Sequence, residues 1–493
     1  MSGSPQHDKE KSHDIVADDV VLPEDPTELE KIRRSLMLKM DLRLVPWVSI
    51  LYMFSSLDRG NIGNARLAGL EKGTHISDSQ YFNVLSMFYA GYTISQVPSN
   101  LMLKRVLPSR WISFTMVMWG VCAASMAATT NYSGLLACRF FMGIFEAGIG
   151  PGAPLLLSWW YLRDELAWRV ALFIGSSTVA GAFGGLISYG IMKNMADNPH
   201  FQPWQIIFLI EGCLTIFFGL LTVIVLPNMP EQASTRLLTP EEKQLAIERY
   251  RSEFNHDDNV FDMSQLVAAF KDTKNWACVL LYIGMNICLS SYTAFLPTII
   301  SEFGVTPLNA QLLSVPPYIC AAVSVFAQCR LSDRMRNRGM FIAGSGLIAA
   351  LGYILLISNG LMGVNYVGAF LVACGIYPII PLTLAWVSNN NIGHTKRAVG
   401  LAMLNMFAQA LAMAGGQIYP TNTAPRFVMG HAICLAFILF TALVAALLSY
   451  YISRINAKRD EQYGPPQQMT RQMMVDAAKD GLYDMHPSFR YYP

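Results

Sequence analysis

Charged residues are scarce in this chain. Of its 493 residues, 14% are Asp, Glu, Lys or Arg and 53% are hydrophobic, whereas roughly 25% of an ordinary soluble domain is charged. The formal net charge of +2 is also far too small for the basic surface of a nucleic-acid-binding protein. The composition therefore excludes both of these classes and predicts an integral membrane protein.

Motifs for metals, disulfides and hydrolytic chemistry are missing as well. The nine cysteines lie in or at the end of apolar runs, without CxxC spacing and without a neighbouring histidine. HExxH and GxSxG are absent. We therefore expect the cysteines to be small core residues, and we expect no metal, no cofactor, no catalytic residue and no enzyme activity. The polar first 40 residues contain no cleavable signal peptide, so we expect the first apolar run itself to direct insertion.

Apolar runs that could cross a bilayer recur along the whole chain. A hydrocarbon core of about 30 Å needs roughly 20 apolar residues in a helix, and about twelve runs meet this need. They lie near residues 44–65, 81–103, 111–129, 134–156, 167–190, 205–226, 276–298, 309–330, 340–358, 364–387, 399–420 and 428–452. The sequence therefore predicts an all-α, multi-pass membrane protein with twelve transmembrane helices.

Lys and Arg in the short loops predict the orientation of these helices, because such residues are enriched on the cytoplasmic side. With the N-terminus placed inside, the inner loops contain Lys104, Arg105, Arg110, Arg163, Arg169, Arg330, Arg334, Arg336, Arg338, Lys396 and Arg397. The outer loops contain only Arg66, Lys72, Lys193 and Arg426. We therefore expect both termini to be cytoplasmic.

One long polar insertion divides the predicted helices into six plus six. We expect a cytoplasmic N-terminal tail (1–43), a six-helix half (44–226), a cytoplasmic linker (227–275), a second six-helix half (276–452) and a cytoplasmic C-terminal tail (453–493). Within the linker, Thr239 and Glu242 form a predicted capping box at the start of an amphipathic helix. This layout is typical of transporters in which two halves move around a site at the bilayer midplane.

Five charged residues lie well inside the predicted spans of the first half: Asp58, Arg59, Arg139, Glu146 and Glu211. An ionisable group inside a span costs several kcal/mol unless it faces the interior of the bundle, so each is a candidate functional residue. For Glu211 we favour a structural hydrogen bond, because beyond Gln205 at its start its span has no other polar residue before Thr215.

Depth and spacing relate the other four residues. At 1.5 Å per residue, Asp58 and Arg139 lie at similar depths, and Glu146 lies two helical turns from Arg139 on the same face. We expect Asp58 and Arg139 to neutralise each other, which leaves Arg59 as a cation for an anionic substrate and Glu146 as a protonatable acid. The alternative is a static buried network, which is costly and rarely kept for stability.

Further polar residues could line a cavity between the halves. They are Tyr92 and Gln96 in the second span, Asn286 and Tyr292 in the seventh, Tyr318 in the eighth, and Asn405 and Gln409 in the eleventh. A single tyrosine in a span is about as often a packing residue or an interface anchor as a ligand contact. At the inner end of the eighth span, Asp333 and Arg334 could form an inner gate by pairing with a neighbouring helix, whereas for Arg336 and Arg338 we favour a role in topology alone.

Several stretches together resemble a known family. They are LDRGNIGNARLAGL (57–70), QVPSNLMLKR (96–105), RFFMGIFEAGIGPGAPLLLSWWY (139–161), FLIEG (208–212), FLPTII (295–300) and NNNIGHTKRAVG (389–400). The chain is similar to the anion:cation symporter group of the major facilitator superfamily, in its fungal allantoate and nicotinate permease branch. The fold implied is the two-half, twelve-helix arrangement.

The resemblance also implies roles for individual residues. It assigns protonation to Asp58 and Glu146, contact with the substrate carboxylate to Arg59, and pairing with the acids to Arg139. It places Tyr92 in the pocket, together with an asparagine of the eleventh span that corresponds to Asn405. The chain departs from the superfamily at the inner end of the second span, where Asn100 and Lys104 replace a glycine and an acid, and only Asp333 of the second half keeps the acid.

The leading hypothesis is proton-coupled import of a small organic carboxylate, such as nicotinate, allantoate or a vitamin-like anion, across the plasma membrane. The partners would be this anion, protons and the lipid bilayer, with no nucleic acid, and we expect a monomer. Two alternatives stay open at this point. The same scaffold could export an organic acid or secondary metabolite, or it could act as a nutrient-sensing receptor with little flux.

Overall fold

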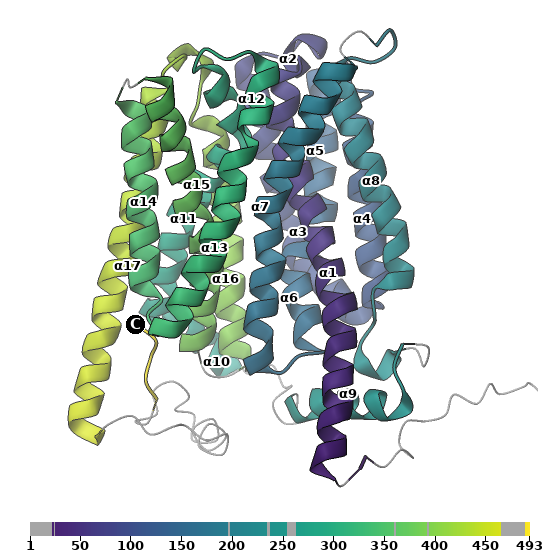
Figure 1. Ribbon diagram of the computed structural model, residues 1–493, viewed down its shortest axis with the longest axis vertical. Helices are drawn as coiled ribbons and strands as arrows, with labels where there is room; N and C mark the ends of the chain where they lie inside the picture. The colour runs from purple at the N-terminus through teal and green to yellow at the C-terminus, as the bar shows by residue number, and fades with distance from the viewer. Residues whose placement is uncertain are drawn as a thin grey trace, which may run out of the picture.

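The computed structural model describes residues 22–23, 25–195, 198–233, 237–253, 263–358, 361–391, 394–464 and 489–493. All regular secondary structure in these residues is helical. The long helices form two groups that lie side by side, one from the first part of the chain and one from the second (Figure 1). The core is formed where the buried faces of these helices meet.

The helices of the first part and the linker are α1 (Pro26–Leu67), α2 (Leu70–Gly73), α3 (Asp78–Arg105), α4 (Pro108–Met126), α5 (Tyr132–Glu146), α6 (Ile149–Ser158), α7 (Arg163–Asn194), α8 (Pro203–Val225), the 3-10 helix η2 (Pro230–Gln232), α9 (Pro240–Glu253) and α10 (Met263–Lys271). Those of the second part are α11 (Thr273–Ser301), α12 (Pro307–Leu313), α13 (Val315–Met335), α14 (Gly339–Ile357), α15 (Met362–Asn390), α16 (His394–Ala412), the 3-10 helices η3 (Met413–Gln417) and η4 (Thr421–Thr423), and α17 (Val428–Tyr463). We call α1–α8 the first half and α11–α17 the second half.

Nine helical segments of the described chain are long and apolar enough to cross a membrane. They start at Tyr132, Trp168, Pro203, Thr273, Pro307, Gly339, Met362, Thr395 and Val428. Helices α1, α3 and α4 also coincide with predicted spans but are not among the nine. A multi-pass membrane protein is therefore supported, while the count of twelve and the position of the termini stay predictions.

Several helices differ from the predicted boundaries. Helix α1 begins at Pro26, well inside the predicted tail, and α17 continues to Tyr463. The predicted span at 134–156 is two helices, because α5 ends at Glu146 and α6 begins at Ile149. A proline at position 151 lacks the N–H that would bond back to residue 147, so the helical hydrogen bonding is interrupted directly after Glu146.

The two halves touch closely at the end of the molecule that carries α2 and α12, at the top of Figure 1. Here α1 packs on α11, and α7 packs on α12 and α13. A methyl group on Gly63 would lie 2.3 Å from the carbonyl oxygen of Ala294, and one on Gly185 would lie 2.7 Å from the hydroxyl of Ser314. Glycine is therefore what allows the backbones of the two halves to approach at this end.

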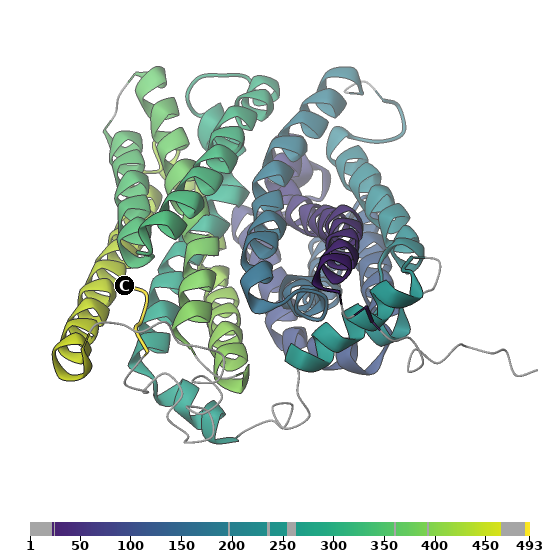
Figure 2. The same cartoon turned by 60° about the horizontal axis from the view of Figure 1, so that its bottom comes forward.

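The linker helix α9 is tied to α1 at the opposite end of the molecule, where Figure 2 shows it in front of the first half. The predicted capping box is confirmed: the N–H of Thr239 donates to Glu242 Oε2 (2.9 Å), and the N–H of Glu242 donates to Thr239 Oγ1 (3.2 Å). The carboxylate of Glu242 also accepts from Ser35 Oγ and Lys39 Nζ, both at 2.6 Å. This buried residue thus joins the linker to the first helix.

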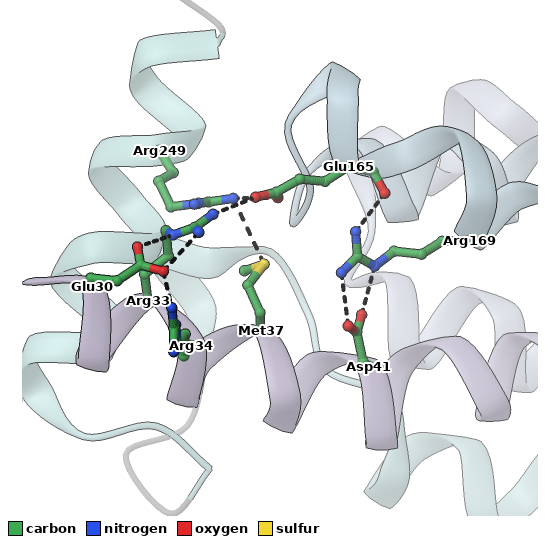
Figure 3. A network of polar contacts seen from close by, with 8 residues as sticks. All are labelled: Glu30, Arg33, Arg34, Met37, Asp41, Glu165, Arg169 and Arg249. Atoms are coloured by element: carbon green, nitrogen blue, oxygen red, sulfur yellow. Dashed lines mark hydrogen bonds and ion pairs between the residues drawn. The ribbon is translucent and has the colours of Figure 1, made fainter. Parts of the chain in front are cut away.

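A second set of polar contacts at this end connects α1, α7 and α9 (Figure 3). The guanidinium of Arg169 on α7 binds Asp41 of α1 through two hydrogen bonds, of 2.6 and 2.8 Å. Glu165 of α7 forms ion pairs with Arg33 of α1 and Arg249 of α9. Ion pairs therefore join α7 to both the first helix, α1, and the linker helix, α9, at this end of the molecule.

The last described segment, residues 489–493, is bound to the second half. The main-chain N–H of Tyr492 donates to Asn390 Oδ1 (2.7 Å), and Asn390 Nδ2 donates back to the carbonyl of Tyr492 (2.9 Å). Tyr491 makes the same kind of double contact with Asn456 of α17, at 3.0 and 2.7 Å. A short piece of chain thus spans the ends of α15 and α17.

Candidate functional site

The charged residues predicted inside the spans gather in the core of the first half. Asp58 and Arg59 are on α1, Arg139 and Glu146 on α5, and Glu211 on α8. The exposed fraction is 2% for Asp58, 1% for Arg139, 0% for Glu146 and 1% for Glu211, and the Arg59 side chain is 19% exposed. The structure therefore brings three carboxyl groups and two guanidinium groups into one buried region, which we call the charge cluster.

Glu146 forms an ion pair with Arg59. Its Oε1 atom accepts from Arg59 Nε (2.8 Å), lies 2.7 Å from Arg59 Nη2, and accepts from Ser55 Oγ (2.6 Å). Arg59 also donates to Ser55 Oγ at 2.8 Å. In the described part of the chain, Glu146 Oε2 has no hydrogen-bond partner. The proposed anion-binding arginine is thus held by one of the two proposed proton-carrying acids.

The carboxylate of Asp58 is held by two uncharged donors. Its Oδ2 accepts from Trp119 Nε1 on α4 and from Thr215 Oγ1 on α8, both at 3.0 Å. Arg139 instead donates from Nη1 to the main-chain carbonyl of Asp58, at 3.5 Å. No hydrogen bond or ion pair joins the side chains of Asp58 and Arg139 in the described chain, but the two groups interact electrostatically, and their mutual neutralisation stays a prediction. Within the described residues, Arg139 Nε and Nη2 have no hydrogen-bond partner.

A cavity between the halves is lined by both arginines of the charge cluster. Its free volume is about 20 Å³, which is room for little more than one water molecule in this conformation. Arg59 and Arg139 line it from the first half, together with Leu85, Phe88, Tyr89, Ser290, Thr293, Ala294 and Gly416. Two buried cations facing one space between low-dielectric walls favour an anion there.

Aromatic rings of α3 support the Arg59 side of this cavity. The guanidinium carbon of Arg59 lies 5.3 Å from the ring centre of Tyr92 and 5.7 Å from that of Phe88, within range of a cation–π interaction. Tyr92 was predicted near the substrate, but Tyr89, which lines the cavity itself, was missed. The signal was available, because Tyr89 lies three residues before Tyr92 on the same helical face.

Tyr318 lies in a second cavity, between α1, α7, α11 and α13. This space, about 20 Å³, is also lined by Asn61, Asn64 and Thr293. The Tyr318 ring stands between those of Tyr292 and Tyr377, with centroid distances of 6.1 and 6.0 Å. The second half thus contributes uncharged aromatic walls where the first half contributes charges.

The remaining predicted pocket residues line neither cavity. Asn286 donates to the carbonyl of Ala408 at 2.9 Å, which joins α11 to α16. Asn405 donates to the carbonyl of Leu401 in its own helix at 3.0 Å. Gln96 is buried, and its Oε1 has no hydrogen-bond partner in the described chain. Contact of these three residues with a substrate stays a prediction.

The acid of the predicted inner gate pairs with the start of the next helix. Asp333 pairs with Arg338, five residues further on in the turn between α13 and α14. Arg334 is exposed. The arginine for which only a topological role was expected, Arg338, is therefore the partner of the acid. A gating role for Asp333 and Arg334 stays a prediction.

Glu211 lacks the structural hydrogen bond that was expected for it. Both of its carboxyl oxygens are buried without a partner in the described residues.

Comparisons with known proteins agree with this arrangement. The family described as Major Facilitator Superfamily matches residues 48–417. The chain is 35% identical over 439 residues to the MFS-type transporter cnsO of Penicillium expansum, covering 87% of this chain and 85% of that protein. It is 31% identical over 467 residues to the high-affinity nicotinic acid transporter of Saccharomyces cerevisiae, covering 94% and 86%.

Solved structures show the same fold. A bacterial homologue of the human lysosomal transporter Spinster, in an inward-facing and unoccupied conformation, matches with a TM-score of 0.65 at 15% identity. The match covers 84% of this chain and 97% of that chain. At this identity the likeness concerns the fold alone.

Proposed function

The chain belongs to the major facilitator superfamily, and we propose that it is a proton-coupled importer of a small organic carboxylate at the plasma membrane. One observation carries the proposal: Arg59 and Arg139, the two arginines of the charge cluster, line one cavity between the halves. A guanidinium presents a planar set of donors that fits a carboxylate. The 31% identity to a nicotinic acid transporter supports this class of substrate.

The contacts of Arg59 suggest how proton and anion are coupled. Arg59 is held by Glu146, so a substrate carboxylate has to replace Glu146 on the same guanidinium. Glu146 would then be a buried carboxylate without a cation, which is strongly unfavourable. A proton on Glu146 removes this penalty and frees Arg59 for the substrate. Protonation and anion binding therefore support each other, as symport requires.

Asp58 provides a second acid close to the same cavity. Its carboxylate is held by Trp119 and Thr215, and Arg139 contacts its main-chain carbonyl. A change at Asp58 can therefore alter how Arg139 is placed in the cavity wall. We assign proton coupling to Asp58 and Glu146, and anion binding to Arg59 and Arg139.

The test is uptake of labelled carboxylates by cells or proteoliposomes at acidic and alkaline external pH, with nicotinate in the panel. We expect uptake of at least one anion to rise with external acidity and to collapse with a protonophore. Glu146→Gln and Asp58→Asn should each abolish accumulation driven by a proton gradient, while exchange of internal for external substrate continues. Equal uptake at both pH values under a preserved membrane potential would contradict the proposal.

A further inference from the structure

Glu211 is the buried acid of the charge cluster that the coupling scheme does not use. It lies on α8 and is fully buried, with no hydrogen-bond partner for either oxygen in the described part of the chain. A buried carboxylate without such partners is costly, whereas a protonated carboxyl group is far less so. Glu211 therefore differs from Glu146, which has an arginine, and from Asp58, which accepts two hydrogen bonds.

The packing of α8 fixes where Glu211 points. Thr215, one turn along the helix and on the same face, donates to Asp58 Oδ2. Close packing holds this face in place, because a methyl group on Gly212 would lie 2.5 Å from the main-chain nitrogen of Ala124 on α4. Glu211 is thus beside Asp58 and about 6 Å nearer than Thr215 to the end of the molecule with α2 and α12, which is the predicted outer end.

The charges around Glu211 do not balance unless one acid holds a proton. Three carboxyl groups share two guanidinium groups, and Arg59 is committed to Glu146. The charged groups that interact electrostatically with Glu211 are Asp58 of α1 and Arg139 of α5, while α4 contributes Trp119 as a donor to Asp58. Arg139 can neutralise one of the two acids. The other has to be neutral in this low-dielectric setting.

We infer that Glu211 is a third proton-binding group of this transporter, neutral while Arg139 is engaged with α1 and ionised when Arg139 turns towards α8. Arg139 can make this change because its Nε and Nη2 atoms are buried without partners in the described chain. The proton that leaves the Glu211 carboxyl is accepted by Asp58, whose cation has then moved away. Glu211 would thereby pass a proton from the outer side to Asp58. The inference deepens the proposed function and rests on it.

Infrared difference spectroscopy of the purified protein in H₂O and D₂O tests the protonation without any substrate. A protonated buried carboxyl group gives a carbonyl-stretching band that is distinct from carboxylate bands and shifts in D₂O. We expect the wild type to show this band near neutral pH and Glu211→Gln to lose it. Glu211→Asp should keep the band at a shifted position, which also covers the case in which the glutamine variant does not fold.

A matched Glu→Gln variant serves as the control. Glu30 is an exposed residue outside the predicted spans, and hydrogen bonds from Arg33 and Arg34 lower its pKa to about 2, so it is ionised at neutral pH. Glu30→Gln should therefore leave the band in place. Absence of the band from the wild type, or its persistence in Glu211→Gln, would overturn the inference.

Transport separates this inference from the proposed function. Glu211→Gln should lose accumulation driven by a proton gradient while its KM for exchange stays within about twofold of the wild type. A merely structural residue would lower expression or raise KM and leave the pH profile unchanged, and that result would refute the role in coupling. If the wild type shows no dependence on protons at all, the proposed function fails, whereas the infrared band still reports on Glu211.

Discussion

The two halves of the protein bury different chemistry. The first half encloses the carboxyl and guanidinium groups of the charge cluster. In the described second half, the fully buried lysine and arginine side chains are Arg338 and Lys396, and both lie at helix starts, away from the middle of the bundle. The other buried polar side chains there include tyrosines such as Tyr292, whose hydroxyl donates to the carbonyl of Ala369 at 3.0 Å.

This difference shows how similar helical halves can divide one task. Ionisable side chains can exchange partners only where several of them lie close together. The charge cluster of the first half is such a region. Uncharged walls that are satisfied by backbone carbonyls can move as a unit without any change in protonation. We therefore expect substitutions in the first half to alter coupling and substitutions in the second half to alter shape or stability.

The largest expected effect comes from Arg59→Gln, which removes one of the two cations of the charge cluster. Breaking a buried pair by removing one partner costs about 3–5 kcal/mol, because the other charge is left uncompensated. We expect a clear loss of thermal stability in detergent and loss of uptake by more than about 100-fold. Uptake within about twofold of the wild type would contradict a role for Arg59 in the site.

The double variant Arg59→Gln with Glu146→Gln separates folding from binding. It removes both charges of the pair, so thermal stability should recover while uptake does not. Arg59→Lys keeps the charge but not the planar set of donors, and it should weaken apparent affinity without comparable loss of stability. Recovery of uptake in the double variant would show that the pair is structural.

A smaller effect is expected from Gly63→Ala, which acts where the halves meet. The added methyl group would lie 2.3 Å from the carbonyl oxygen of Ala294, and overpacking of this kind costs about 1–3 kcal/mol. The contact at the α2 and α12 end should therefore loosen, and uptake should fall about 5-fold to 100-fold. The matched control is Gly190→Ala on α7, where no atom lies within 4 Å of the added group. Equal behaviour of the two variants would contradict the importance of this contact.

The smallest effect is expected from Asp272→Asn, at the start of the second half. Asp272 caps α11 through the N–H of Lys274 (3.0 Å) and pairs with Lys396 (2.9 Å). Burial acts to raise the pKa of Asp272, but Lys274 and Lys396 outweigh it, and the pKa is lowered. Asparagine keeps the cap and removes the charge, so we expect a loss of about 1–2 kcal/mol of stability with an unchanged pH profile of uptake.

The sign of this effect follows from the lowered pKa. The Asp272 interaction contributes fully above the unfolded value of about 3.9 and is lost as the pH falls through the lower folded value. The stability difference between the wild type and Asp272→Asn should therefore be constant from neutral to mildly acidic pH. It should disappear only in strong acid, as measured by thermal unfolding. If Asp272→Asn instead changed proton-driven accumulation, this would contradict the proposal that residues of the second half do not take part in coupling.

The sequence could predict the membrane class and the members of the charge cluster, because charges within apolar runs are rare and costly. It could not predict the partners within the cluster. Asp58 and Arg139 have the expected similar depth, but the rotation of α4 and α8 decides that Trp119 and Thr215 reach the Asp58 carboxylate. Such rotations depend on contacts like that of Gly212 with Ala124, which no spacing rule provides.

Polar residues without charge were harder to assign. Asn286 and Asn405 share a residue type and an apolar setting, yet one joins two helices and the other bonds within its own helix. Arg66 was expected to be a topological charge of an outer loop, but it lies within α1, is buried and pairs with Glu71 and Asp78. In each case the role depends on which neighbour faces the side chain.

The bound segment at residues 489–493 has a consequence for work with the purified or tagged protein. Its last residue, Pro493, accepts hydrogen bonds from the main-chain N–H groups of Arg338 (2.7 Å) and Gly339 (3.2 Å). A fluorescent protein or affinity tag fused directly to Pro493 would have to continue from this contact at the start of α14, and it would compete with the docking of the segment. Expression levels, localisation and melting curves recorded with such a fusion should therefore be compared with those of an untagged chain or of one that carries a long polar spacer.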